Sequence, residues 1–154
     1  MFKAGLIGAV TGFIYITSLT LLSPFCTLCF TPLLGLGVGY LTGWFDKPLK
    51  QESSLSRGGI AGGITGIGAV VGQMLATVVN GILVTNWEQL PDLMRELGFV
   101  QFPIPDANQY WQTTLTANSF CSVLNLTIIS GLGAVGGIIW FQRQNKNSFS
   151  TLPS

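Results

Sequence analysis

The chain has 154 residues, of which seven are basic, six are acidic and none is histidine. Nearly half of the residues are apolar and 20 are glycine, whereas about a quarter of the residues in a soluble domain are charged. This composition excludes a well-solvated globular surface, and a net charge of +1 excludes binding to a nucleic-acid backbone, which needs many basic side chains.

Long segments without charge predict how often the chain crosses a membrane. No charged residue occurs within residues 4–45, 58–87 or 107–142. Because a spanning helix needs about 20 apolar residues, the first segment accommodates two spans and each of the others accommodates one. We therefore predict an all-α membrane protein, with four transmembrane helices forming a single domain over residues 1–141.

The first two spans are predicted over residues 2–22 and 24–45. The apolar N-terminal segment is not followed by an Ala-x-Ala cleavage site, so we interpret it as an anchor and not as a signal peptide. Ser23 is a suitable N-cap for the second span, Pro24 is tolerated at its first position, and Pro32 predicts a kink. A start at Pro32 would leave only about 21 Å of helix, too short for a bilayer core of about 30 Å.

The other two spans are predicted over residues 59–84 and 110–141. The loop between them, residues 85–109, contains the sequence NWEQLPDLMRELGF, in which apolar residues recur at helical spacing. We expect a short amphipathic helix there, lying at the membrane surface or over the end of the bundle. The polar residues 142–154 are expected to form a disordered cytoplasmic tail.

The basic residues predict the orientation. Six of the seven lie before the first span, between the second and third, or after the fourth: Lys3, Lys47, Lys50, Arg57, Arg143 and Lys146. The loop 85–109 contains four acidic residues and one basic residue, Arg95. By the positive-inside rule, both termini are expected on the cytoplasmic side and this loop outside, in a bacterial inner membrane or a thylakoid-type membrane.

Glycines recur at four-residue spacing along the spans. Small residues at this spacing form a flat helix face that a neighbouring backbone can approach closely, and such glycine zippers drive helix association in lipid. The predicted packing positions are Gly8, Gly12, Gly35, Gly39, Gly43, Gly58, Gly62, Gly66, Gly72, Gly133 and Gly137. These rows hold the bundle together, and a row left on its surface would dock a homo-oligomer mate or a larger membrane complex. The third span has rows on more than one face, so we expect it at the centre.

Three polar residues within the spans are candidates for a functional role: Gln73, Asn80 and Asn125. They are suited to hydrogen bonds between helices, to lining a path for a small solute, or to ligating the magnesium of a pigment. The spans contain no charged residue of the kind that ion transporters usually keep, and no base for hydrolysis. Without histidine, haem and the usual chlorophyll ligation are disfavoured. We predict no cofactor, although contact with lipid, quinone or pigment is compatible with the sequence.

The three cysteines lie at one predicted depth. Cys26 precedes Trp44 by 18 residues and Cys121 precedes Trp140 by 19 residues, which places both about 27–29 Å from the inner ends of their spans. Cys29 lies one turn deeper, and all three are near the outer, oxidising side. Inert small thiols, a structural disulfide and a redox centre are all open interpretations. A metal site is not expected, because three thiols without histidine or a nearby carboxylate are an incomplete ligand set.

Two resemblances bear on these alternatives. The sequence CTLC at residues 26–29, together with the four-span layout, resembles membrane thiol oxidases and vitamin K epoxide reductases, which implies a quinone-linked redox role for Cys26, Cys29 and Cys121. Those enzymes carry a second cysteine pair in an outer loop, and the loop 85–109 has none. Over nearly the whole chain, the layout LLSPFCTLCFTPLLGLGVGYLTGWFDKP followed by a glycine-rich span resembles small four-span bacterial membrane proteins without an assigned activity, which implies architecture only.

These observations favour a non-enzymatic integral membrane protein. We predict a structural or accessory subunit that contacts membrane lipid and packs against itself, as a homo-oligomer, or against a larger membrane complex. One alternative is a quinone-linked membrane thiol–disulfide oxidoreductase. The other is a small-solute channel, which requires a continuous polar stripe through Gln73, Asn80 and Asn125.

Overall fold

The computed structural model describes residues 2–22, 27–85 and 107–149. The described chain is helical apart from residues 47–50, and its helices are α1 Phe2–Leu22, α2 Thr27–Asp46, α3 Gln51–Thr85 and α5 Ala107–Phe149. The predicted all-α architecture is confirmed for these residues. The amphipathic helix predicted within residues 85–109 lies almost entirely outside the described residues, as do the last five residues of the predicted tail.

Three of the helices are long and apolar enough to cross a membrane. The qualifying segments are Phe2–Leu21, Gln51–Ile82 and Trp111–Lys146. The first of them lies in α1, whose bounds are those predicted from the sequence. The coarse expectation of a membrane protein with transmembrane helices is therefore supported by the length and composition of α1, α3 and α5.

The observed helix bounds differ from the predicted spans in two places. α3 begins at Gln51 rather than near Gly59, and α5 runs from Ala107 to Phe149 rather than ending near Phe141. Residues 142–149, expected to be disordered, are thus helical. The reason is that hydropathy marks the apolar part of a helix only, whereas an established helix gains one hydrogen bond for each polar residue added to its end.

Pro32 lies inside α2 and does not start it. The helix begins five residues earlier, at Thr27, so the shorter alternative is wrong. At its other end, Lys47 adopts a φ of 42°, and its N–H donates to the carbonyl oxygen of Gly43 at 2.9 Å. This left-handed residue caps α2, and residues 47–50 then reverse the chain direction into α3.

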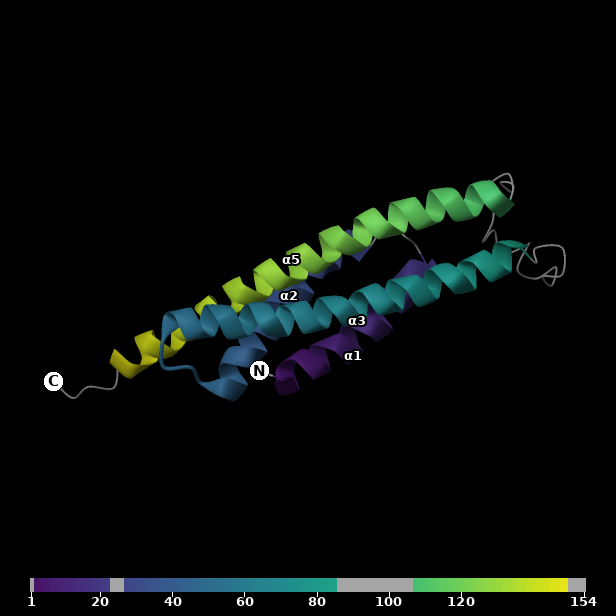
Figure 1. Ribbon diagram of the computed structural model, residues 1–154. Coiled ribbons are helices and arrows are strands. Elements are labelled where there is room, and N and C mark those ends of the chain that lie inside the picture. Colours follow the sequence, from purple (N-terminus) through teal and green to yellow (C-terminus); the bar gives the residue numbers. More distant parts are fainter. Residues whose placement is uncertain (1, 23–26, 86–106, 150–154) are drawn as a thin grey trace.

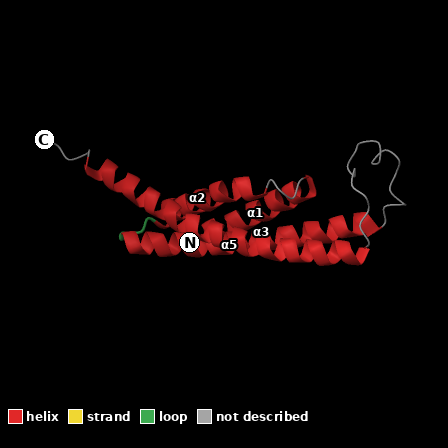
Figure 2. Ribbon diagram, turned by 90° about the horizontal axis from the view of Figure 1, so that it is seen from above, coloured by secondary structure: helices red, strands yellow, loops and turns green. Residues whose placement is uncertain are grey.

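The described helices form an antiparallel bundle (Figures 1 and 2). The start of α1, the connection between α2 and α3, and the end of α5 lie at the same end of the bundle. α3 packs against each of the other described helices, as its several rows of small residues predict, and α2 does so as well. The basic residues listed above therefore belong to segments that meet at one end of the molecule.

Small and polar side chains fill the interior, while large apolar side chains cover the outside. Buried positions include Ala61, Ala69 and Ala76 in α3, together with several threonines, and Ile16 and Ile129 are the largest fully buried apolar residues. The exposed set includes Phe2, Leu6, Ile14, Leu33, Ile67, Ile82, Phe120 and Val123. In water this arrangement would leave these large apolar side chains uncovered, whereas in lipid the outer face needs no cover.

Candidate functional site

Gln73 of α3 is the centre of a buried group of polar side chains. It is 3% exposed, and its Nε2 donates to Oδ1 of Asn118 at 3.0 Å. Its Oε1 accepts from Oγ of Ser122 and from Nδ2 of Asn125, both at 3.4 Å. One side chain of α3 therefore contacts three successive turns of α5.

The group extends from Gln73 in two directions. Oδ1 of Asn125 accepts from Oγ1 of Thr31 at 3.1 Å, which brings α2 into the group. On the other side, Nδ2 of Asn118 donates to Oγ1 of Thr77, whose hydroxyl donates to the backbone oxygen of Gln73 at 2.8 Å. We call this set the polar cluster, and its members are Thr31, Gln73, Thr77, Asn118, Ser122 and Asn125.

Helix periodicity explains why these residues meet. Asn118, Ser122 and Asn125 are separated by four and three residues, and Gln73 and Thr77 by four, so each set shares one helix face. Gln73 and Asn125 were predicted as candidates, whereas Ser122 and Thr31 were not. The spacing of Ser122 from the two asparagines is a signal that could have identified it, but nothing local to Thr31 indicates its partner on α5.

Asn80 does not belong to the polar cluster. Its Nδ2 donates to the backbone oxygen of Thr20 in α1 at 3.4 Å. Asn80 lies about 10 Å further along α3 than Gln73, and its partner is on α1 whereas those of Gln73 are on α5. Thr20 is 5% exposed, and its hydroxyl has no hydrogen-bond partner among the residues that the structure describes.

The chemistry of the polar cluster is that of neutral hydrogen bonding. Its members carry amides and hydroxyls, and none has an acid, base or thiol that would act as a nucleophile or transfer a proton. Within residues 2–22, 27–85 and 107–149, no group of three or more His, Cys, Asp or Glu side chains gathers that would hold a metal ion. The geometry suits the cluster to aligning three helices.

The structure describes one of the three candidate thiols. Cys121 on α5 is half-buried and free. Cys26 and the side chain of Cys29 lie outside the described residues. The three interpretations of the cysteines, namely inert thiols, a disulfide and a redox centre, therefore stay predictions.

Several glycines lie where helix backbones approach closely. A Cβ at Gly39 of α2 or at Gly58 of α3 would clash with the carbonyl oxygen of Gly133 in α5. A Cβ at Gly133 would in turn lie 2.6 Å from the carbonyl oxygen of Gly58 and 3.1 Å from Cα of Gly62. Three helices thus meet at Gly133 with no room for a side chain.

The same lack of space recurs at most of the predicted packing positions. A Cβ would lie closer than 3.0 Å to another helix at Gly8, Gly35, Gly39, Gly43, Gly58, Gly62, Gly66, Gly72, Gly133 and Gly137. Gly12 is less restricted, since the nearest atom would be 3.5 Å away. Three glycines that are not among these positions are equally tight: Gly68 against Ala9, Gly81 against the Trp111 ring and Gly136 against Leu36. Gly37 and Gly131 face open space.

Serine side chains add hydrogen bonds where α3 and α5 are close. Oγ of Ser54 donates to the carbonyl oxygen of Gly137 at 2.7 Å. Oγ of Ser130 donates to the carbonyl oxygen of Gly59 at 3.2 Å. Because Ser54 is 1% exposed, its hydroxyl would be costly to bury without this partner.

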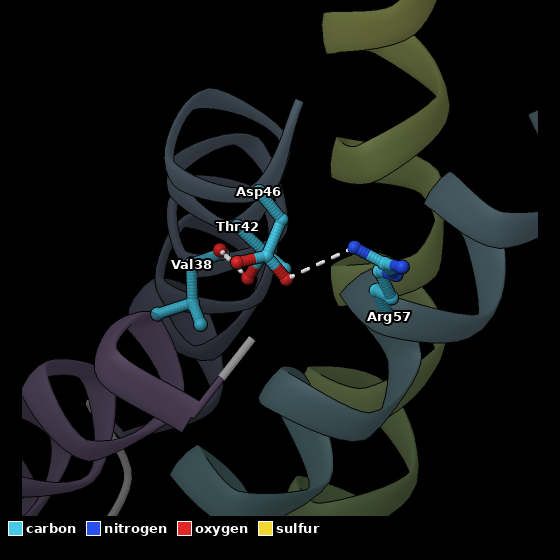
Figure 3. Close-up of polar contacts among 4 residues, drawn as sticks. All are labelled: Val38, Thr42, Asp46 and Arg57. Atoms are coloured by element: carbon cyan, nitrogen blue, oxygen red, sulfur yellow. Dashed lines mark hydrogen bonds and ion pairs between the residues drawn. The ribbon is translucent and has the colours of Figure 1, made fainter. Parts of the chain in front are cut away.

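A further contact joins α2 and α3 at the basic end of the bundle. Nη1 of Arg57 lies 3.7 Å from Oδ2 of Asp46, and Figure 3 shows the two side chains reaching toward each other. One turn before Asp46, Oγ1 of Thr42 donates to the backbone oxygen of Val38 at 2.8 Å. Arg57 is substantially exposed, so the ion pair contributes at most about 1 kcal/mol.

Comparison with protein-family models, with curated proteins and with solved structures gave no match. The features that bear on function are therefore the polar cluster, the close contacts at glycine, and the placing of large apolar side chains on the outside of the bundle with small and polar ones inside. Each of them concerns how helices pack, within the bundle or against their surroundings.

Proposed function

We propose that this chain is a four-span integral membrane protein that acts as a structural or accessory subunit, packing against copies of itself or against a larger membrane complex. The observation that carries the proposal is the inverted distribution of side chains, with alanine, glycine and threonine inside and large apolar residues outside. A surface of this kind is stable in lipid and would aggregate in water.

The fourth span in this proposal is α2. It has 20 residues, which correspond to about 30 Å of helix and match the thickness of a bilayer core. It packs between α1 and α5 as part of the same bundle. Its charged end residue, Asp46, lies at the end of the bundle that carries the basic residues, where a membrane surface would be.

The proposed topology places this basic end on the cytoplasmic side. Lys3, Lys47, Lys50, Arg143 and Lys146 are all exposed, and they lie on segments that share this end. The positive-inside rule then puts both termini in the cytoplasm.

Glycine zippers are the proposed source of helix association. In lipid, exposed apolar side chains give no driving force for association, so close backbone packing and interhelical hydrogen bonds must supply it. The contacts at Gly133 and the hydrogen bonds of the polar cluster supply both between α2, α3 and α5.

The separation of Asn80 from the polar cluster favours packing over a solute path. A channel would require Gln73, Asn80 and Asn125 to face one continuous passage. Gln73 and Asn125 instead bond to each other and to neighbouring helices, while Asn80 bonds to α1. Each amide thus has a protein partner, which is the arrangement expected of groups that hold helices together.

Mild extraction followed by native mass spectrometry tests the proposal. We expect the protein in the membrane fraction, and in the spectrum either several copies of the chain or a complex of fixed stoichiometry. A strictly monomeric protein in the bilayer, measured by single-molecule photobleaching, would contradict a subunit role. A copurifying quinone, together with loss of thiol oxidation in Cys26→Ser, would favour the oxidoreductase alternative instead.

A further inference from the structure

A small cavity of about 210 Å³ opens between α2 and α5 at the basic end of the bundle. Its lining residues are Tyr40 from α2 and Trp140, Arg143 and Gln144 from α5. Trp140 belongs to the last apolar turn of α5 and Arg143 and Gln144 to the polar turn after it, where the sequence changes from IIWF to QRQN. In a membrane, this is the level at which acyl chains give way to headgroups.

Close contacts between α2 and α5 lie beside the cavity. At Gly136 the two backbones are in close contact, since a Cβ there would meet the carbonyl oxygen of Leu36 and lie 3.0 Å from the N atom of Tyr40. One turn further along α5, the ring of Trp140 packs on Gly43, where a Cβ would lie 2.6 Å from the indole. α2 then ends at Asp46 while α5 continues to Phe149, and the cavity lies between Tyr40 of α2 and the α5 residues Trp140, Arg143 and Gln144.

The described residues that line the cavity are rich in hydrogen-bond donors, and none of them is a carboxylate. A phenol O–H, an indole N–H, a guanidinium and a side-chain amide can all donate. Trp140 is 7% exposed and held against Gly43, so one wall is fixed. Arg143 is exposed and forms no ion pair within the described part of the chain, which leaves its planar fork available to an oxyanion.

A larger space at the same end provides a contrast. It has a volume of about 650 Å³ and is lined by Lys50, Gln51, Glu52, Leu55 and Ile138. Lys50 and Glu52 contribute charges of opposite sign, so this second cavity has no excess of positive charge. The cavity at Arg143 is positive, and it lies at an end where six basic residues outnumber the acidic Asp46 and Glu52.

We propose that the cavity between α2 and α5 binds the phosphodiester headgroup of an anionic phospholipid. Arg143 donates to two phosphate oxygens, Tyr40 and Trp140 provide the aromatic walls found at membrane interfaces, and the acyl chains run along the exposed apolar residues. This inference rests on the proposed membrane location. The match between a positive, donor-lined cavity at the headgroup level and an anionic headgroup is what favours this occupant.

Nanodiscs of phosphatidylcholine with added phosphatidylglycerol test the proposal. Protein released from them in mild detergent is analysed by native mass spectrometry, and the retained phosphatidylglycerol is quantified. Arg143→Lys keeps the charge but loses the bidentate fork, so we expect about fivefold weaker retention, and Arg143→Gln about tenfold or more. Lys146→Arg is the matched control, because Lys146 lies on the same helix end outside the cavity, and its retention should equal that of the wild type.

The outcomes separate this inference from the proposed function. The proposed site would be overturned if Arg143→Lys retained as much phosphatidylglycerol as the wild type, or if Arg143→Lys and Lys146→Arg changed its retention equally. Either result would show a general electrostatic attraction between the basic end and anionic lipid. Displacement of the lipid by inorganic phosphate would assign the cavity to free anions and overturn the lipid assignment. Failure of the wild-type protein to enter nanodiscs would refute the membrane proposal itself.

Discussion

Gly133 lies where α2, α3 and α5 meet, and its side chain is a single hydrogen atom because backbone atoms occupy the remaining space. Gly131, two residues earlier, faces open space on the same helix. The two positions have the same residue type and the same helical conformation, so they form a matched pair for testing close packing.

The first prediction uses this pair. Gly133→Ala should destabilise the bundle by about 1–3 kcal/mol, since the added methyl group forces α3 and α5 apart. Gly131→Ala should be neutral or stabilising by up to about 1 kcal/mol, because alanine is the better helix former. Thermal unfolding in mild detergent, followed by circular dichroism, measures both. Equal midpoints for the two variants would argue against close packing at Gly133.

The second prediction concerns Lys47, whose φ of 42° lies in the left-handed region. Glycine adopts this conformation without steric cost and is the residue usually found at such a helix end. Lys47→Gly should therefore stabilise the protein by about 1 kcal/mol. Lys47→Ala removes the same charge without relieving the backbone, so a similar gain in Lys47→Ala would attribute the effect to charge.

At the scale of helices, the polar cluster fixes how α5 sits against α3. Gln73 bonds to residues from three turns of α5 at once. A shift of α5 by one turn, about 5.4 Å, would break these bonds together. The cluster therefore specifies the register between two glycine-rich faces that would otherwise pack in several similar ways.

The third prediction tests this coupling. Gln73→Leu should cost about 1–2 kcal/mol, the range for interhelical hydrogen bonds in lipid. Combining it with Asn118→Leu should cost less than the sum of the two single changes, because both remove the same bond. Thr127→Val is the control, since Thr127 is exposed and its hydroxyl donates to the backbone oxygen of Val123 in its own helix. Strict additivity of Gln73→Leu and Asn118→Leu would contradict a shared network.

The helix bounds show which structural features could be predicted from the sequence. The bounds of α1 were predicted correctly because its apolar segment and its helix coincide. α5 has 43 residues, about 64 Å of helix, and its polar ends carry no hydropathy signal that distinguishes helix from tail. In the same way, Gln73 and Asn125 were predicted as candidates because they are polar residues within apolar spans, whereas the role of Thr31 depends on a partner 94 residues away.

For the molecule as a whole, the start of α1 and the end of α5 lie at the same end of the bundle, and this arrangement can be tested by a topology experiment. In a background with Cys26, Cys29 and Cys121 changed to serine, single cysteines at Lys3 and Lys146 should react with an impermeant thiol reagent from the same side of the membrane. A cysteine at Asp92, in the loop predicted to lie outside, should react from the opposite side. Labelling of Lys3 and Lys146 positions from different sides would contradict the bundle's arrangement.

The placing of small residues inside the bundle and large apolar residues outside also determines which substitutions the protein tolerates. Buried positions such as Ala61, Ala69 and Gly62 restrict volume, so any larger residue is excluded there whatever its polarity. Outward positions such as Leu33 and Phe120 restrict polarity, so one apolar residue can replace another of different shape. Random mutagenesis should therefore recover only small residues at the buried positions and only apolar residues at the outward positions. A protein that folds in water shows the reverse pattern, with large apolar residues inside and polar residues outside.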